Sequence, residues 1–165
     1  MLIFKEAAEL SSYLKNPKIG FVPTMGALHE GHISLVQRAK KENEVVVCSI
    51  FINPSQFNNA DDFNKYPVTL EKDTEHLIEA QCDILFLPSV DEMYPSSHVK
   101  KTYPLGPIEN LLEGKYRPGH FQGVCEVVDR LLEIVNPYQI YLGQKDYQQC
   151  MVIKKLIQIL GKENQ

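Results

Sequence analysis

The chain has 165 residues, of which 44% are hydrophobic and 23% charged, and its net charge is −4. This length and composition fit one globular domain with a real core, and the acidic balance argues against a nucleic-acid partner. No apolar run approaches the roughly 20 residues needed to cross a bilayer, and residues 1–6 become charged too early for a signal peptide. We therefore expect a cytoplasmic protein without a membrane partner.

The four cysteines, at positions 48, 82, 125 and 150, are scattered and form neither a Cys-x-x-Cys motif nor a zinc pattern. Three of them stand beside apolar residues, which predicts buried, reduced thiols in a reducing compartment. We assign no cysteine a chemical role and predict no metal-ligating residue.

Hydrophobic periodicity predicts helices that alternate with short apolar strands. The first amphipathic helix covers residues 5–14 and stops at Asn16-Pro17, because proline cannot continue a helix. Residues 91–118 carry much of the Pro and Gly content and are predicted to be irregular, with a candidate strand at 99–105. The other predicted strands are 19–22, 45–52, 84–87 and 140–142, and the other predicted helices are about 32–41, 69–80, 121–135 and 146–160.

Strands that alternate with helices indicate an α/β fold, a Rossmann-like parallel sheet with helices on both faces. In such folds ligands bind beyond the carboxyl ends of the strands. Several loops at such ends carry polar side chains, and we expect them to build one site.

The most informative segment is Pro23–His32, which lies between a predicted strand and a predicted helix. A helix N-terminus offers unpaired N–H donors and a partial positive charge, so anions bind there. Gly31 has no side chain that would hold a phosphate away from the backbone, and His29 and His32 lie three residues apart on one helix face. Two imidazoles there can donate hydrogen bonds to phosphate oxygens. The pattern indicates a nucleoside triphosphate site, the alternative being two surface histidines that flank a turn.

Two further loops follow predicted strands and carry polar side chains. After the second predicted strand, Gln56 offers a donor and an acceptor for a hydroxyl or a carboxylate, although a solvated loop residue is the alternative. After the last predicted strand, Lys145 can reach a phosphate, and Asp146 either caps the next helix or contacts a ligand. Gln149 is expected on the same helix face as Asp146.

The segment Tyr116–Phe121 carries Arg117, which could pair with a carboxylate, and His120, which could orient it; a basic surface turn is the alternative. No paired catalytic carboxylates and no Ser/His/Asp order stand out, so a hydrolase has little support. The remaining acidic residues are expected on solvated faces, and one of them could hold a nucleotide-bound Mg²⁺, which needs few protein ligands. These residues are Asp61, Asp62, Glu71, Asp73 and Glu75.

Taken together, these motifs resemble the pantothenate synthetase family, which belongs to the His-x-Gly-His nucleotidyltransferase superfamily. The match runs in order through nearly the whole chain and is far more specific than any one motif. The segments that carry it are Pro23–His32, Asn53–Phe57, Tyr66-Pro67, Met93–Pro95, Arg117–Phe121 and Gly143–Gln149.

The resemblance implies an ATP-dependent ligase that joins pantoate to β-alanine through a pantoyl adenylate and releases pyrophosphate and AMP, with Mg²⁺ accompanying ATP. It implies that His32 is the proton donor and that Gln56 and Gln149 hold pantoate, with Gln56 also near β-alanine. Arg117 and His120 are implied near pantoate. The implied ATP-contacting residues are Met25, Gly26, Ala27, Leu28, His29, Glu30, Gly31, His32, Gly143, Gln144, Lys145 and Asp146.

Two departures from the family pattern bear on these expectations. Gln144 stands where the family usually has Glu, a side chain that need not touch the nucleotide. Family members also carry a smaller C-terminal domain, with a Ser-Ser-Arg loop that closes over the triphosphate, which residues 1–165 do not contain. We therefore expect a single nucleotide-binding domain that has little activity without that part. The resemblance also implies a homodimer formed through this same domain. The rival hypotheses are another nucleotidyltransferase, which would need a cationic acceptor pocket, and a non-catalytic nucleotide-binding or dimerising module.

Overall fold

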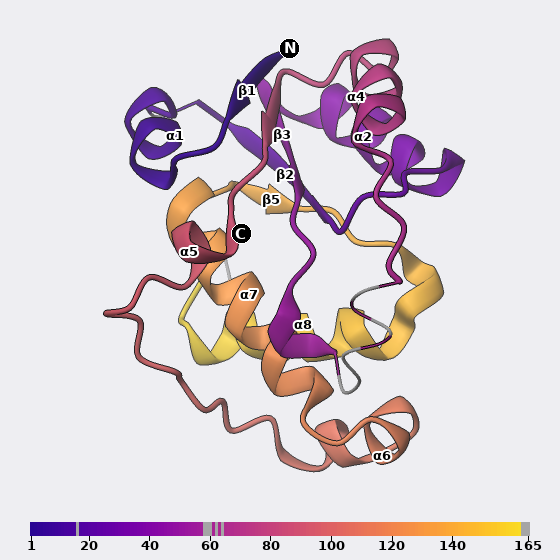
Figure 1. Cartoon of the computed structure of the whole chain (residues 1–165), viewed down its shortest axis with the longest axis vertical. Coiled ribbons are helices and arrows are strands. Elements are labelled where there is room, and N and C mark those ends of the chain that lie inside the picture. The colour runs from indigo at the N-terminus through magenta and orange to yellow at the C-terminus, as the bar shows by residue number, and fades with distance from the viewer. Residues whose placement is uncertain (16, 58–60, 62, 64, 163–165) are drawn as a thin grey trace.

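The computed structural model describes all residues except 16, 58–60, 62, 64 and 163–165. Within the described residues, five strands form one parallel sheet in the order β1-β4-β3-β2-β5 (Figure 1). This sheet confirms the predicted Rossmann-like α/β fold. The strands are β1 (Leu2–Phe4), β2 (Ile19–Thr24), β3 (Val45–Ile50), β4 (Ile84–Phe86) and β5 (Gln139–Ile140).

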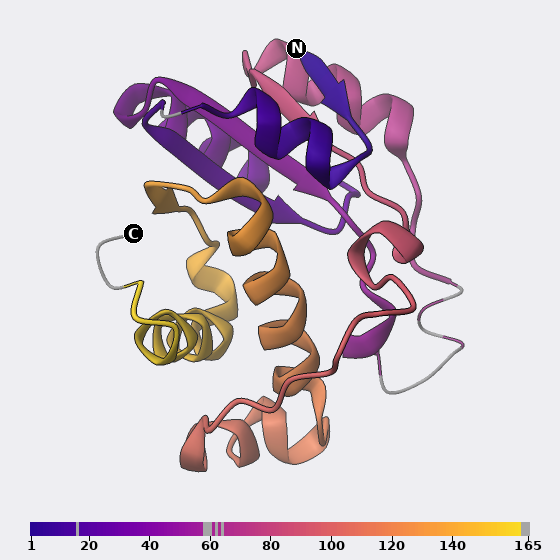
Figure 2. The same cartoon turned by 90° about the vertical axis from the view of Figure 1, so that its left-hand side faces the viewer.

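Helices cover both faces of the sheet (Figure 2). One layer holds α1 (Ala7–Tyr13), α7 (His120–Val135) and α8 (Tyr147–Ile159), and the other holds α2 (Glu30–Glu42) and α4 (Leu70–Glu79). Successive strand residues face opposite layers, so Phe21 and Val47 join the core beneath α7 while Val22 and Cys48 join the core beneath α2. The shorter helical segments are η1 (Pro54–Gln56), α5 (Val90–Met93), η2 (Gly106–Asn110), α6 (Glu113–Tyr116) and η3 (Gln144–Asp146).

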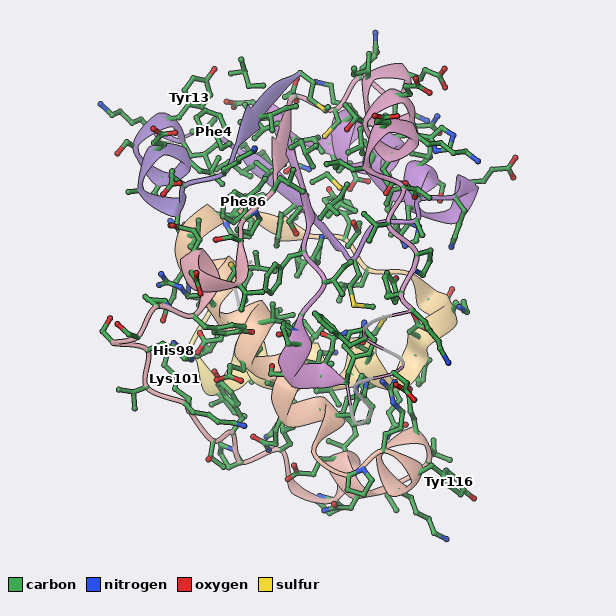
Figure 3. The ribbon with its side chains drawn as sticks, viewed as in Figure 1. Phe4, Tyr13, Phe86, His98, Lys101 and Tyr116 are labelled. Atoms are coloured by element: carbon green, nitrogen blue, oxygen red, sulfur yellow. The ribbon has the colours of Figure 1, made fainter. Side chains whose placement is uncertain are left out.

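The segment 99–105 forms an extended strap along α7, so the candidate strand predicted there is wrong. Gln122 of α7 bonds both main-chain groups of Tyr103: its Oε1 accepts the N–H at 3.0 Å and its Nε2 donates to the carbonyl at 2.9 Å. Figure 3 shows Lys101 on this strap and His98 immediately before it. Both pair with carboxylates of α7, His98 at 3.0 Å and Lys101 at 2.8 Å. Side chains of α7 therefore take the place of a neighbouring strand.

The other predicted elements are present with bounds shifted by a few residues, and one strand was not predicted. β1 lies at the edge of the sheet and is apolar throughout, but three residues are too few to show a strand periodicity. The rings of Phe4 and Tyr13, 5.2 Å apart, join β1 to α1 (Figure 3). The loop predicted after the second predicted strand, which carries Gln56, contains the short helical turn η1.

Candidate active site

A cavity of about 720 Å³ lies beyond the carboxyl ends of β2, β3 and β5, where parallel α/β sheets bind their ligands. Two predicted site residues do not line it: Leu28 is buried in the core beneath α2, and Glu30 is exposed in the first turn of that helix. The predicted residues that do line it are Met25, Gly26, Ala27, His29, Gly31, His32, Gln56, Gly143, Gln144, Lys145, Asp146 and Gln149.

The loop between β2 and α2 is held by Asp73, which lies on α4. Its carboxylate accepts the main-chain N–H groups of Ala27 at 2.9 Å and Leu28 at 2.7 Å, and also the hydroxyl of Thr69 at 3.1 Å. Gly26 and Ala27 both have positive φ, +84° and +51°, so the loop adopts a left-handed path that these bonds stabilise. The conformation of this loop is therefore held by a carboxylate from another element.

The prediction that Asp73 lies on a solvated face is wrong, because its side chain is only 1% exposed. The expectation of an exposed face is confirmed for Asp61, Glu71 and Glu75, whereas Asp62 lies outside the described residues. No local signal separates Asp73 from its acidic neighbours, since any acid in the first turn of a helix suits the helix dipole.

His29 and His32 lie at the mouth of α2, where each ring contacts a main-chain N–H group. Nδ1 of His29 accepts the N–H of Gly31 at 3.1 Å, and Nδ1 of His32 accepts the N–H of His29 at 3.4 Å. Because Nδ1 accepts in both rings, the ring proton lies on Nε2 and can be donated from there. Their centroids are 4.2 Å apart. A Cβ at Gly31 would lie 2.8 Å from Cε1 of His29, so this glycine also makes room for the ring.

Burial is the main cause that lowers the pKa of His32 below its ordinary value. The nearby His29 and Lys145 lower this pKa further, whereas Asp73 and Asp146 act in the opposite direction. In the absence of a ligand, His32 is therefore a neutral hydrogen-bond donor at neutral pH.

The second loop carries Gln56, which is 8% exposed and donates from Nε2 to Sδ of Met25 at 2.9 Å. Asn53, which is fully buried, ties this loop to α7 by donating to the carbonyl of Gly123 at 3.1 Å. Oδ1 of Asn53 in turn accepts the hydroxyl of Tyr94 at 2.9 Å. Asn53 thus anchors the start of the loop from which the Gln56 side chain reaches the cavity.

Replacing Gly123 with Ala is expected to destabilise the fold, because a Cβ there would lie 2.4 Å from the carbonyl oxygen of Ser55 and 2.9 Å from Cα of Gln56. The overlap costs about 3 kcal/mol and outweighs the roughly 1 kcal/mol that alanine gains over glycine in a helix. Thermal unfolding measures the difference. Gly143→Ala is the control, since nothing lies within 4 Å of a Cβ there. A Gly123→Ala protein that melts no lower than the parent contradicts this packing.

The third loop, η3 and the start of α8, carries Lys145 and Asp146, both exposed at the cavity. Asp146 occupies the N-cap position of α8, but its side chain makes no capping hydrogen bond. Its position is therefore that of a cap, whereas contact between its carboxylate and a ligand stays a prediction. Gln149 lines the same cavity one helical turn later, as predicted from the spacing.

One wall of the cavity is apolar and was not predicted from the sequence. It is formed by α7, whose opposite face carries the strap, and by a residue of α8. The side chains are those of Val124, Val127, Val128, Leu131 and Ile153.

A family model for pantoate–β-alanine ligases matches residues 2–164. The chain belongs to this family. It is 53% identical over 147 residues to a pantothenate synthetase of Francisella tularensis, an alignment that covers 89% of this chain and 56% of that protein. The chain therefore spans a little over half the length of the curated relatives it matches.

Solved structures agree with this membership in the family. The pantothenate synthetase of Thermus thermophilus superposes with a TM-score of 0.94 at 47% identity, covering 99% of this chain and 59% of that one. A pantoate–β-alanine ligase of Francisella tularensis, complexed with beta-gamma ATP and β-alanine, gives the same TM-score and identity. This match covers 100% of the present chain and 65% of the Francisella chain.

Arg117 and His120, for which the family resemblance implied a place near pantoate, do not line the cavity. Both lie behind Gln56 and contact its main-chain carbonyl.

In the described part of the chain, no helix is long and apolar enough to cross a membrane. Across the same residues, no group of three or more His, Cys, Asp or Glu side chains is placed to hold a metal ion.

Proposed function

We propose that this chain supplies the nucleotide and acid sites of an enzyme that condenses pantoate with β-alanine, using ATP and forming a pantoyl adenylate. The observation that carries the proposal is that one cavity collects the two histidines of the helix mouth, Lys145 and Asp146, and the two glutamines. The family membership and the relative complexed with beta-gamma ATP and β-alanine support it.

In the first step, a pantoate carboxylate oxygen attacks the α-phosphorus of ATP, and the bond from that phosphorus to the pyrophosphate oxygen breaks. Negative charge grows on the phosphate oxygens, so preformed donors there lower the barrier. His29 and His32 offer Nε2–H donors, and Lys145 offers a mobile positive charge. His32 is the proposed proton donor, since anionic phosphate at its ring raises the pKa that burial lowers.

In the second step, the amine of β-alanine attacks the acyl carbon of the adenylate, and the bond to the phosphate oxygen breaks to release AMP. This route needs no covalent nucleophile from the protein, because the basic side chains and the two glutamines of the cavity hold and orient the reactants. Placing the reacting groups together is itself a large part of such catalysis.

The shape of the acid site favours pantoate over a phosphorylated acceptor. The glutamines can bond a hydroxyl and a carboxylate, and the apolar wall of α7 suits a branched aliphatic body. Among the described lining residues, the basic ones are His29, His32 and Lys145, which the triphosphate of ATP requires. A second phosphate would find no cation of its own, which counts against another nucleotidyltransferase.

Three further expectations belong to the proposal. Mg²⁺ would arrive with ATP and be held mainly by phosphate oxygens and water, since magnesium needs few protein ligands. The free thiols of the four cysteines suit a reducing cytoplasm. The family resemblance supports a homodimer through this domain, and light scattering that finds only monomer would contradict it.

The function is tested by pyrophosphate release from ATP, measured with the complete gene product and with this chain. We expect release by the complete gene product only when pantoate is present, and pantothenate and AMP once β-alanine is added. Release that ignores pantoate would favour another nucleotidyltransferase. Calorimetric binding of ATP without turnover in either protein would favour a binding module.

A further inference from the structure

A chain of polar contacts behind the cavity ends on the main chain of Gln56. Nδ1 of His120 lies 2.9 Å from the Gln56 carbonyl oxygen, and Nε2 of the same ring lies 3.2 Å from a guanidinium nitrogen of Arg117. Arg117 also donates to Glu113 at 2.6 Å and to the Gln56 carbonyl at 3.4 Å. These contacts join α6 and the start of α7 to the loop that carries Gln56.

The partners of His120 fix its protonation. A guanidinium can only donate, so Nε2 accepts from Arg117 and the ring proton sits on Nδ1, where it donates to the Gln56 carbonyl. His120 is 4% exposed, and burial, opposed by the bond to Gln56, lowers the pKa of its ring, as does the charge of Arg117. Glu113 faces the same ring, with 3.8 Å between its Oε1 and Nε2. The neutral ring is thus held in one tautomer.

The Gln56 backbone depends on this contact. Its N–H reaches the Asn53 carbonyl at 3.4 Å, the weak end of a hydrogen bond, so the turn itself holds the residue loosely. The His120 bond is shorter, and it fixes the peptide group from which the Gln56 side chain enters the cavity toward Met25.

We propose that His120 and Arg117 are positioning residues for the substrate acid, holding Gln56 from behind the cavity without touching substrate. This inference rests on the proposed function, in which Gln56 binds pantoate. It differs from a role in substrate contact, because neither side chain lines the cavity. It also differs from a role in stability alone, because it predicts a higher KM for pantoate with little change in the KM for ATP.

The test compares His120→Asn with His120→Leu in steady-state kinetics of the complete gene product. Asn and Leu are nearly the same size, but the Asn amide nitrogen can stand where Nδ1 stands and Leu offers no donor. We expect His120→Leu to raise the KM for pantoate about tenfold, the effect of one lost hydrogen bond to a buried carbonyl, with the KM for ATP within twofold. His120→Asn should restore most of the loss.

Equal losses in the two variants, or a KM for ATP that rises as much as that for pantoate, would overturn the inference. If His120→Leu does not fold, Arg117→Gln replaces it, since the Arg117 side chain is 38% exposed and tolerates change. That variant should raise the KM for pantoate about threefold, and an unchanged KM would overturn the inference equally. Failure of the proposed function is seen separately, as an absence of pantoate-dependent turnover in the parent protein.

Discussion

The Asp73→Asn variant is expected to unfold with about 2–3 kcal/mol less free energy and to bind ATP at least about tenfold more weakly. Asp73 is buried and accepts two main-chain N–H groups of the loop between β2 and α2, from Ala27 and Leu28. An amide has one oxygen for these two donors, so its NH₂ group must face one of them. The left-handed path of the loop would then be lost together with the bonds that hold it.

Denaturant unfolding and calorimetry with ATP measure the two effects of Asp73→Asn. Glu75→Gln is the matched control, because it makes the same change of charge on the same helix at an exposed position. We expect the control to stay within about 0.5 kcal/mol of the parent. An Asp73→Asn protein with parental stability and affinity would show that the loop holds its shape without the carboxylate.

The second large effect is expected at His32. Replacing it with Asn should lower kcat of the complete gene product about 10²–10³-fold, the usual effect of losing one donor to developing negative charge. The Asn amide oxygen can take the place of Nδ1, which accepts the N–H of His29 in this structure, but no donor of Asn reaches the position of Nε2. His32→Gln places its amide nitrogen near Nε2 and should retain much of the activity.

Melting temperatures of both His32 variants should stay close to the parent, because the ring is only partly buried. Single-turnover formation of the adenylate separates the chemical step from binding. If Asn and Gln variants turn over equally well, Nε2 of His32 is not the donor that the mechanism requires.

Local sequence patterns were sufficient to predict the part of the site that lies within single strand–loop–helix units. The mouth of α2 and the loop before α8 each combine an apolar strand, a glycine and a polar helix start, and both line the cavity as predicted. Their meeting follows from the parallel sheet, since the carboxyl ends of its strands share one edge.

Contacts between residues far apart in the chain could not be predicted in this way. Asp73 and Ala27 are 46 residues apart, and Gly123 meets Ser55 only because α7 crosses η1. The strap at 99–105 shows the converse: its residues have strand-like composition, yet Gln122 bonds its main chain. Periodicity reports which face of an element is apolar, but not which element covers it.

The account is tested most directly by binding a stable analogue of pantoyl adenylate, with a sulfamate in place of the phosphate, to this chain. We assume that the two histidines at the start of α2, the loop that carries Lys145, and the glutamines Gln56 and Gln149 form one site. The analogue then binds with 1:1 stoichiometry and more tightly than ATP or pantoate alone. It also prevents the binding of both. The account is contradicted if ATP or pantoate binds with unchanged affinity to the chain saturated with the analogue.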